Sequence, residues 1–170
     1  MGTTRLLLPF THGIDVCAID SALRLAKGYD ATLVPLALIY LPEDRRSKGA
    51  RLEHIQQSKD FLDLVKHKAA RYGVPIERLE VYTSNVAESI RAIASEMECE
   101  GILLFAGDTN DILLSSIEMK RLMEHFTCKL YVLRLETGGG RSLKQILRTR
   151  FANWFSGMPT QQDELLKIQN

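Results

Sequence analysis

Hydrophobic residues gather into five short runs along this chain, separated by longer segments of mixed character. The runs are rich in Leu, Ile, Val and aromatic residues, which favour β-strands. They occupy residues 5–10, 32–40, 77–82, 101–106 and 129–135. Three of them contain the segments LLLPF, LVPLALIY and GILLFA, which are almost continuously apolar. Such strands are typical of a parallel sheet that helices cover on both faces.

The segments between the runs repeat apolar residues every three or four positions, which predicts amphipathic helices. The expected inward-facing residues are Ile14, Ala18, Ala22, Leu25 and Ala26 in the first helix, Leu52, Ile55, Leu62, Val65, Ala69 and Tyr72 in the second, and Val86, Ile90, Ile93 and Met97 in the third. The third helix is predicted to begin at Asn85, with Glu88 at the spacing of a capping box. A fourth helix is predicted over about residues 112–126.

Alternating strands and helices predict a doubly wound α/β domain with right-handed crossovers. Such domains bind ligands at the carboxyl ends of the strands, where the direction of winding reverses. The loops that begin at Thr11, Leu41 and Gly107 follow three of the predicted strands, so a site is expected there. The charged segment 42–50 is predicted to be a surface loop that leads into the second helix.

Five segments together resemble the universal stress protein family over about residues 4–135. They are RLLLPF, ALRLAKGYDATL, VYTSNVAESI, GILLFAG and HFTCKLYVL. The resemblance implies a five-stranded parallel sheet of order 3-2-1-4-5, as in the adenine-nucleotide α-hydrolase-like fold, and homodimers formed through the last strand. The chain then divides into a family-like domain at 1–135, a glycine-rich hinge at 136–140 and a helical tail at 141–170.

The nucleotide motif of the family is only partly present. Members that bind ATP carry an Asp after the first strand and a G-x2-G-x9-G-[ST] loop after the fourth. Here Thr11 stands in place of the Asp, so the carboxylate that would engage ribose and magnesium is missing. Gly107 matches the first glycine, but Asn110 replaces the second, and alignment from HFTC puts Ser116 at the last. Asp108 and Asp111 add negative charge to a loop that would have to meet phosphates.

Two hypotheses follow for this loop. The favoured one is a closed or empty cleft without a cofactor. The alternative is a site for ATP or AMP with Mg, in which adenine packs beside Leu38 and Ile39 and phosphate meets Ser115 and Ser116 at a helix start. The residues of that alternative site are Thr11, Leu38, Ile39, Gly107, Asn110, Ser115 and Ser116.

Composition argues for an ordinary globular protein. The 22 basic and 21 acidic residues nearly balance, so nucleic acid is not an expected partner. Cys17, Cys99 and Cys128 lack the spacing of metal ligands and are interpreted as reduced core thiols. His12 lies at the expected site, but no motif supplies a nucleophile, so no catalytic residue and no metal are predicted. No apolar run is long enough to span a membrane, and a cytoplasmic location is expected.

The segment after the hinge has its own pattern. Between Ser142 and Phe155, six residues form one apolar stripe at helical spacing: Leu143, Ile146, Leu147, Phe151, Trp154 and Phe155. Basic residues lie largely off the stripe: Arg141, Lys144, Arg148 and Arg150. The stripe is interpreted first as a face that docks on the domain or its dimer partner. A membrane surface with anionic lipid is the alternative.

Together these patterns favour a non-enzymatic stress-response or regulatory module. It is expected to be a homodimer that acts through an unidentified protein partner. The first alternative is a nucleotide-dependent switch or weak ATPase. The second is a peripheral adaptor that associates with a membrane through the tail at 141–170.

Overall fold

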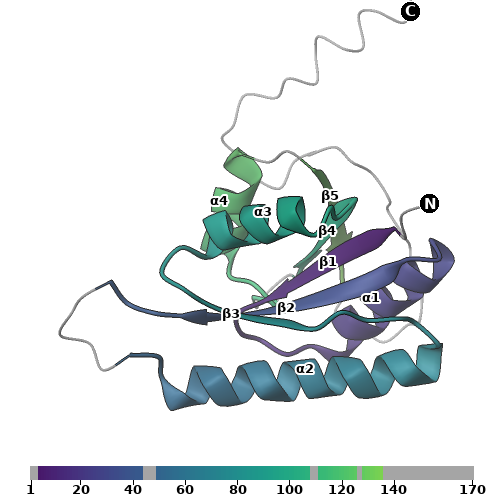
Figure 1. Ribbon diagram of the computed structural model, residues 1–170, viewed down its shortest axis with the longest axis horizontal. Coiled ribbons are helices and arrows are strands. Elements are labelled where there is room, and N and C mark those ends of the chain that lie inside the picture. Colours follow the sequence, from purple (N-terminus) through teal and green to yellow (C-terminus); the bar gives the residue numbers. More distant parts are fainter. Residues whose placement is uncertain (1–3, 44–48, 108–110, 126–127, 136–170) are drawn as a thin grey trace, which may run out of the picture.

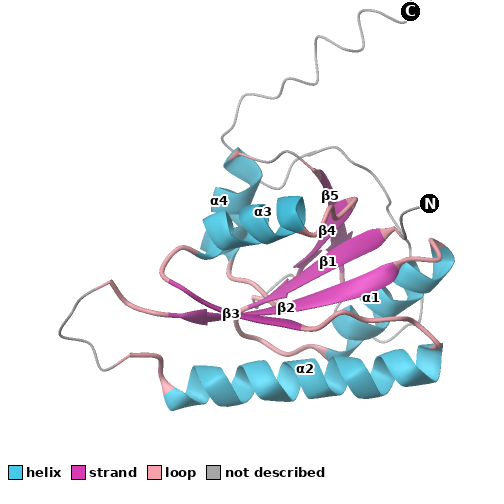
Figure 2. Cartoon of the chain, viewed as in Figure 1, coloured by secondary structure: helices cyan, strands magenta, loops and turns pink. Residues whose placement is uncertain are grey.

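A computed structural model describes residues 4–43, 49–107, 111–125 and 128–135, and in this part of the chain strands and helices alternate (Figures 1 and 2). The strands are β1 (Arg5–Phe10), β2 (Thr32–Tyr40), β3 (Leu79–Thr83), β4 (Gly101–Ala106) and β5 (Lys129–Arg134). The helices are α1 (Val16–Gly28), α2 (Leu52–Tyr72), α3 (Val86–Glu96) and α4 (Ser116–Glu124). The predicted hinge and tail, residues 136–170, lie outside the described residues.

The five strands form one parallel sheet of order β3-β2-β1-β4-β5, which confirms the predicted fold class. β1 is central: Phe10 is in register with Ala37 of β2, and Leu6 is in register with Gly101 of β4. The chain winds from β1 toward β3 in its first half and from β4 to β5 in its second. The winding therefore reverses between β1 and β4, which is where doubly wound sheets place ligands.

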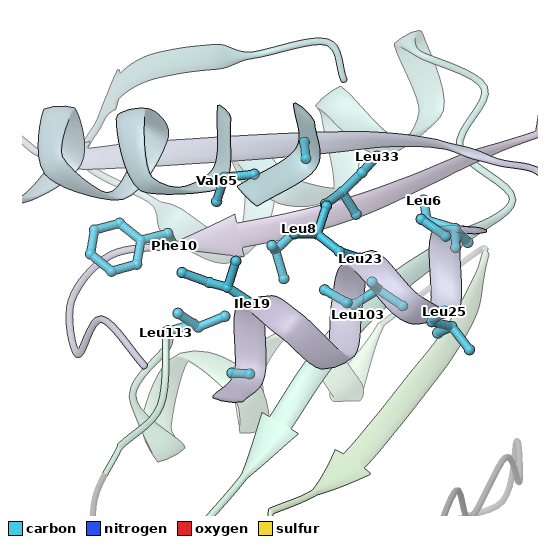
Figure 3. Packing of buried hydrophobic residues seen from close by; sticks show 14 of the residues in the cluster. Leu6, Leu8, Phe10, Ile19, Leu23, Leu25, Leu33, Val65, Leu103 and Leu113 are labelled. Carbon is cyan, nitrogen blue, oxygen red and sulfur yellow. The ribbon is translucent and has the colours of Figure 1, made fainter. Parts of the chain in front are cut away.

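Two helices cover each face of the sheet. α1 and α2 lie on one side, and α3 and α4 lie on the other (Figure 1). Each side has its own hydrophobic core, and Figure 3 shows the one beneath α1 and α2. β2 is buried at every position from Thr32 to Ile39, as expected for a strand covered on both faces.

A stacked pair of aromatic rings holds α2 against the end of β1. Phe10 and Phe61 have ring centroids 4.3 Å apart at an interplanar angle of 7°, and both are fully buried. Replacing a buried Phe with Ala typically costs about 3–5 kcal/mol. This contact fixes the carboxyl end of β1, from which the loop at Thr11 departs.

The fourth helix is shorter than predicted, because Ile112, Leu113 and Leu114 are not helical. Ile112 and Leu113 join the core under α1 and α2, whereas Leu114 joins the core under α3 and α4. Leu113 has a positive φ of 63°, which a residue within a right-handed α-helix does not adopt. The apolar triplet that suggested a helix start therefore crosses between the two faces of the sheet.

Two predicted core residues are exposed instead. Ile14 precedes α1 and is 38% exposed, and Leu52 lies in the first turn of α2 with 79% exposure. Asn85 caps α3 as predicted, since its side chain accepts from the Glu88 amide. The reciprocal half of that capping box is absent among the described contacts: Glu88 pairs with Arg91, and the Asn85 amide donates to the Thr83 hydroxyl.

Candidate functional site

The loops that follow β1 and β4 meet directly at the reversal point of the sheet. The Thr11 amide donates to the Leu113 carbonyl at 2.8 Å, and the Leu113 amide donates to the Gly13 carbonyl at 3.1 Å. Gly13 has a φ of 72°, and a Cβ placed there would lie 2.6 Å from the Asp111 carbonyl oxygen. We call residues 11–13 and 111–113 the loop junction. These backbone bonds hold the described parts of the two loops against each other.

Leu113 fills the space beneath the loop junction. Its side chain is 2% exposed and lies beside Ile19 of α1 (Figure 3). A left-handed conformation costs a residue with a Cβ about 1–2 kcal/mol. Full burial of a Leu side chain returns about 1.5–3 kcal/mol, so the arrangement is favourable. Leu113 therefore places an apolar side chain in the core directly beneath the two loops.

The start of α4 is capped by side chains of its own segment. The Ser115 hydroxyl accepts from the Glu118 amide at 3.2 Å, and the Glu118 carboxylate accepts from the Ser115 amide at 2.8 Å, which completes a capping box. The Asp111 carboxylate accepts from both the amide and the hydroxyl of Ser116, at 3.1 and 2.8 Å. Three amides that a phosphate would need are thus already bonded.

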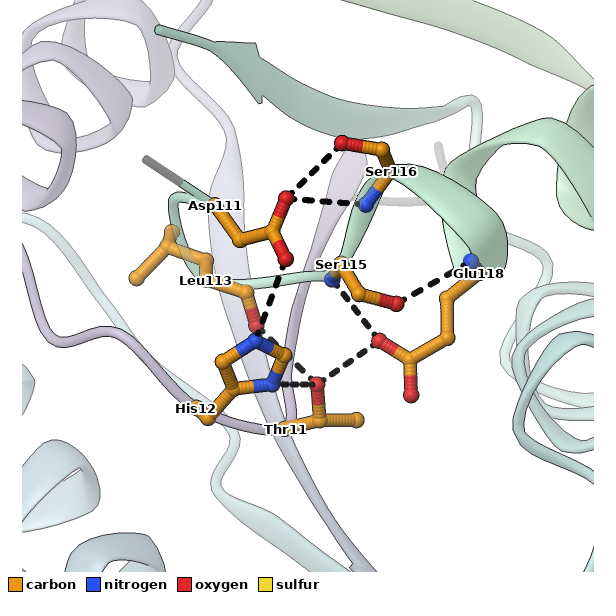
Figure 4. A network of polar contacts seen from close by, with 7 residues as sticks. All are labelled: Thr11, His12, Asp111, Leu113, Ser115, Ser116 and Glu118. Atoms are coloured by element: carbon orange, nitrogen blue, oxygen red, sulfur yellow. Dashed lines mark hydrogen bonds and ion pairs between the residues drawn. The ribbon is translucent and has the colours of Figure 1, made fainter. Parts of the chain in front are cut away.

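A second polar contact joins the start of α4 to β1 (Figure 4). The Thr11 hydroxyl donates to the Glu118 carboxylate at 2.9 Å and lies 2.9 Å from Nδ1 of His12. Because a hydroxyl carries one hydrogen, His12 Nδ1 is then the donor to the Thr11 oxygen. The His12 Nε2 lies 3.7 Å from the Asp111 carboxylate. A hydroxyl beside an imidazole can serve nucleophilic catalysis, but this hydroxyl is directed at a carboxylate.

The electrostatics of the loop junction oppose a phosphate. The hydroxyl of Ser116, helped by its amide and by nearby His12, holds the pKa of Asp111 below its ordinary value despite some desolvation. Asp111 is therefore charged near neutral pH. Two like charges 4 Å apart repel by about 1 kcal/mol in water and about 4 kcal/mol near a protein surface. With Glu118 beside it, the helix start already holds the negative charge that its dipole favours.

The structure brings together three of the predicted site residues, Thr11, Ser115 and Ser116. Gly107 lies directly after β4, and Asn110 lies outside the described residues. Leu38 and Ile39 are 2% and 0% exposed, so their side chains belong to the core. The nucleotide contacts predicted for these residues stay predictions.

Sequence reasoning missed Glu118, although a signal for it was present. Ser115 and Glu118 have the spacing of a capping box, and this pattern marks a helix start at Ser115. The roles of Leu113 and Gly13 had no such local signal, because they depend on contact between loops about 100 positions apart.

A separate polar groove of about 390 Å³ lies between the start of α3 and the end of α4. Its lining includes Asn85, Arg91, Arg121 and Glu124. Arg91 already bonds Glu88 and the Arg121 carbonyl. The groove is thus distinct from the loop junction, which lies at the start of α4.

The cysteines differ in their surroundings. Cys99 is buried and Cys128 is partly buried, as predicted, but Cys17 is exposed on α1, so its assignment to the core was wrong. Burial raises the pKa of Cys99 to about 11. Within the described residues, no group of three or more His, Cys, Asp and Glu side chains could hold a metal ion. None of the described helices is long and apolar enough to cross a membrane.

Comparison with solved structures places this fold among universal stress proteins. A family member from Burkholderia pseudomallei matches with a TM-score of 0.61 and 21% identity, over 76% of this chain and 95% of that one. A universal stress protein from Archaeoglobus fulgidus in complex with dAMP matches with a TM-score of 0.56 and 13% identity, over 77% and 97%. One from Arabidopsis thaliana with AMP bound matches with a TM-score of 0.52 and 12% identity, over 79% and 93%.

No protein-family model and no curated protein matches the chain. The described domain has a doubly wound α/β fold with sheet order 3-2-1-4-5, which is the adenine-nucleotide α-hydrolase-like fold. Within that class its fold is that of the universal stress proteins, which confirms the resemblance seen in the sequence at the level of the fold. Fold alone does not fix function, which has to be argued from the site.

Proposed function

We propose that this chain is a non-enzymatic stress-response or regulatory module of the universal stress protein type. It acts through protein contacts, as a homodimer, and binds no nucleotide at the β1–β4 edge. The observation that carries this proposal is the loop junction, in which Thr11 and Gly13 bond directly to Leu113. Asp111 and Glu118 occupy the helix amides that would otherwise attract a phosphate.

The alternative is a nucleotide-dependent switch. It is favoured by one observation, which is that some solved structures with this fold contain dAMP, cAMP or AMP. For nucleotide to bind between the loops that follow β1 and β4, the loop junction would have to open. Opening would break the Thr11–Leu113 and Gly13–Leu113 bonds and expose the Leu113 side chain. The two hypotheses therefore differ in a measurable ligand affinity.

The test is the thermal midpoint of the purified chain with and without millimolar MgATP and MgAMP. Nucleotide released on denaturation is analysed by chromatography in parallel. A ligand at 100 times its dissociation constant would add about 2.7 kcal/mol of stability, which raises the midpoint by several degrees. The closed loop junction predicts no shift and no bound nucleotide. A reproducible shift, or nucleotide that purifies with the chain, would reject the proposal in favour of the switch.

A further inference from the structure

The outer strand β5 has an apolar face that the described chain covers only in part. Leu103 and Phe105 of β4 point toward α1 and α2 and are each 1% exposed. Their register partners in β5 are Tyr131 and Leu133, which pack against the same core but stay partly exposed. The helices on this side of the sheet therefore cover β4 completely but β5 only in part.

Leu135 and Tyr29 extend this apolar face at its two ends. Leu135 follows β5 and packs on the same core while staying partly exposed. Tyr29 ends α1 with 45% exposure, and its ring centroid is 6.3 Å from that of Tyr131. We call Tyr29, Tyr131, Leu133 and Leu135 the β5 face. In Figure 1, α1 and α2 lie on one side of the sheet, and β5 is the last strand at one edge of that sheet.

The described chain ends at one end of the β5 face. The Leu135 amide donates to the Ala106 carbonyl, so the chain leaves the sheet at its carboxyl edge beside β4. Another 35 residues follow, because the sequence has 170. They include the apolar stripe between Ser142 and Phe155, which the proposed function does not use. The apolar stripe therefore begins only a few residues after Leu135, the last residue of the β5 face.

We propose that residues 142–155 form a helix that packs on the β5 face of the same molecule. Lengths agree: a helix of 14 residues spans about 21 Å, and a strand of six residues spans about 20 Å. The linker 136–141 has six residues and reaches at most about 20 Å, which allows the chain to turn back along β5. Its glycines at 138–140 suit such a turn. The stripe then faces Tyr131 and Leu133, and Arg141 and Arg148 lie beyond its edge, toward water.

The place where the described chain ends favours the β5 face over the opposite edge of the sheet as the docking face. β3 also has partly exposed apolar residues, Leu79 and Val81, on the face toward α3 and α4. The described chain ends beside β5, however, and β3 lies at the opposite edge of the sheet. A helix on the β5 face also leaves the outer backbone groups of β5 available. It is therefore compatible with pairing of β5 strands between two copies.

Trp154 is the only tryptophan of the chain, so its fluorescence reports on the tail alone. In the full-length protein we expect short-wavelength emission that acrylamide quenches weakly, independent of protein concentration. Leu147→Glu, on the stripe, should shift the emission to longer wavelength and raise the quenching several-fold. Gln145→Glu, on the opposite side of the predicted helix, is the matched control and should change neither property.

A second pair of variants tests the docking face. Tyr29→Glu changes an exposed residue and should fold normally, yet it should also shift Trp154 emission to longer wavelength. Ile117→Glu changes a 66% exposed apolar residue on α4, outside the β5 face, and should have no effect. Circular dichroism verifies that all variants keep the fold.

Three outcomes would overturn the proposal. The first is long-wavelength emission in the free full-length protein that shifts only when vesicles of phosphatidylglycerol are added, which would assign the stripe to a membrane. The second is short-wavelength emission that is lost on dilution, which would assign it to a second copy. The third is emission sensitive to Leu147→Glu but unchanged by Tyr29→Glu, which would place the helix on another face. None of these outcomes depends on whether nucleotide binds.

Discussion

Gly13 and Gly73 share a left-handed backbone but differ in their surroundings. Their φ angles are 72° and 67°, yet only at Gly13 would a Cβ meet another atom, the Asp111 carbonyl oxygen. Gly73→Ala should cost about 1 kcal/mol from backbone strain alone. Gly13→Ala should cost about 1–3 kcal/mol more, because the added methyl would push the two loops apart. Urea unfolding of both variants measures the difference, and equal losses would show that the loop junction tolerates separation.

Asp111 predicts how stability depends on acid. The Ser116 hydroxyl is the main cause that lowers the pKa of Asp111 in the folded protein. The ionised carboxylate therefore contributes fully to folding stability above its unfolded pKa of about 3.9, and this contribution is lost as pH falls through the folded pKa. Asp111→Asn should therefore lower the thermal midpoint near pH 7. The difference in thermal midpoint between this variant and the unmodified chain should become smaller below about pH 4. A gap that is constant from pH 7 to the acid limit would mean that ionised Asp111 does not support the loop junction.

At the N-terminus of α4, carboxylates of the chain accept the backbone amides that could otherwise bind an anion. Replacing both Asp111 and Glu118 with Ala frees the amides of Ser115 and Ser116, at a cost of about 0.5–2 kcal/mol for each lost carboxylate acceptor. Exposed amides at a helix start attract anions. Inorganic phosphate should then raise the thermal midpoint of the double variant but not that of the unmodified chain.

The control for this prediction removes the same charge elsewhere. Glu80 of β3 and Glu96 of α3 are exposed residues away from the start of α4, so replacing both with Ala tests the effect of net charge alone. Phosphate should stabilise the control no more than the unmodified chain. Equal stabilisation of both double variants would mean that phosphate acts through net charge and that the α4 amides are no anion site.

For the whole molecule, the outer edge of β5 allows a test of whether two copies pair through this strand. The Leu135 amide points to β4, and alternation along a strand turns the Val132 amide outward. If two copies pair through β5, Val132→Pro should produce monomers, because proline removes that donor while an edge strand tolerates it. Val132→Ala keeps the donor and should stay dimeric. Sedimentation measures both, and a Val132→Pro dimer would exclude pairing at this position.

Much of the fold was predictable because it follows from local pattern. Strands such as Arg5–Phe10 and Gly101–Ala106 begin and end where predicted, since continuous apolar runs leave few alternatives for a buried parallel strand. The sheet order followed from the resemblance to the universal stress protein family, and the alternation of strands and helices gave only a doubly wound sheet. Of the site, the sequence identified Thr11, Ser115 and Ser116 but not the contacts that occupy them.

The sequence by itself thus determined the elements, their order and the absence of the Asp expected after the first strand. Only the tertiary structure decided that residues 112–114 cross between two cores rather than extend a helix. It also decided that Glu118 bonds Thr11 and that Leu113 bonds the loop after β1 and packs beneath it. The physical reason is range: a hydrophobic run is a property of neighbouring residues, whereas these contacts join residues about 100 positions apart that meet only when the sheet has formed.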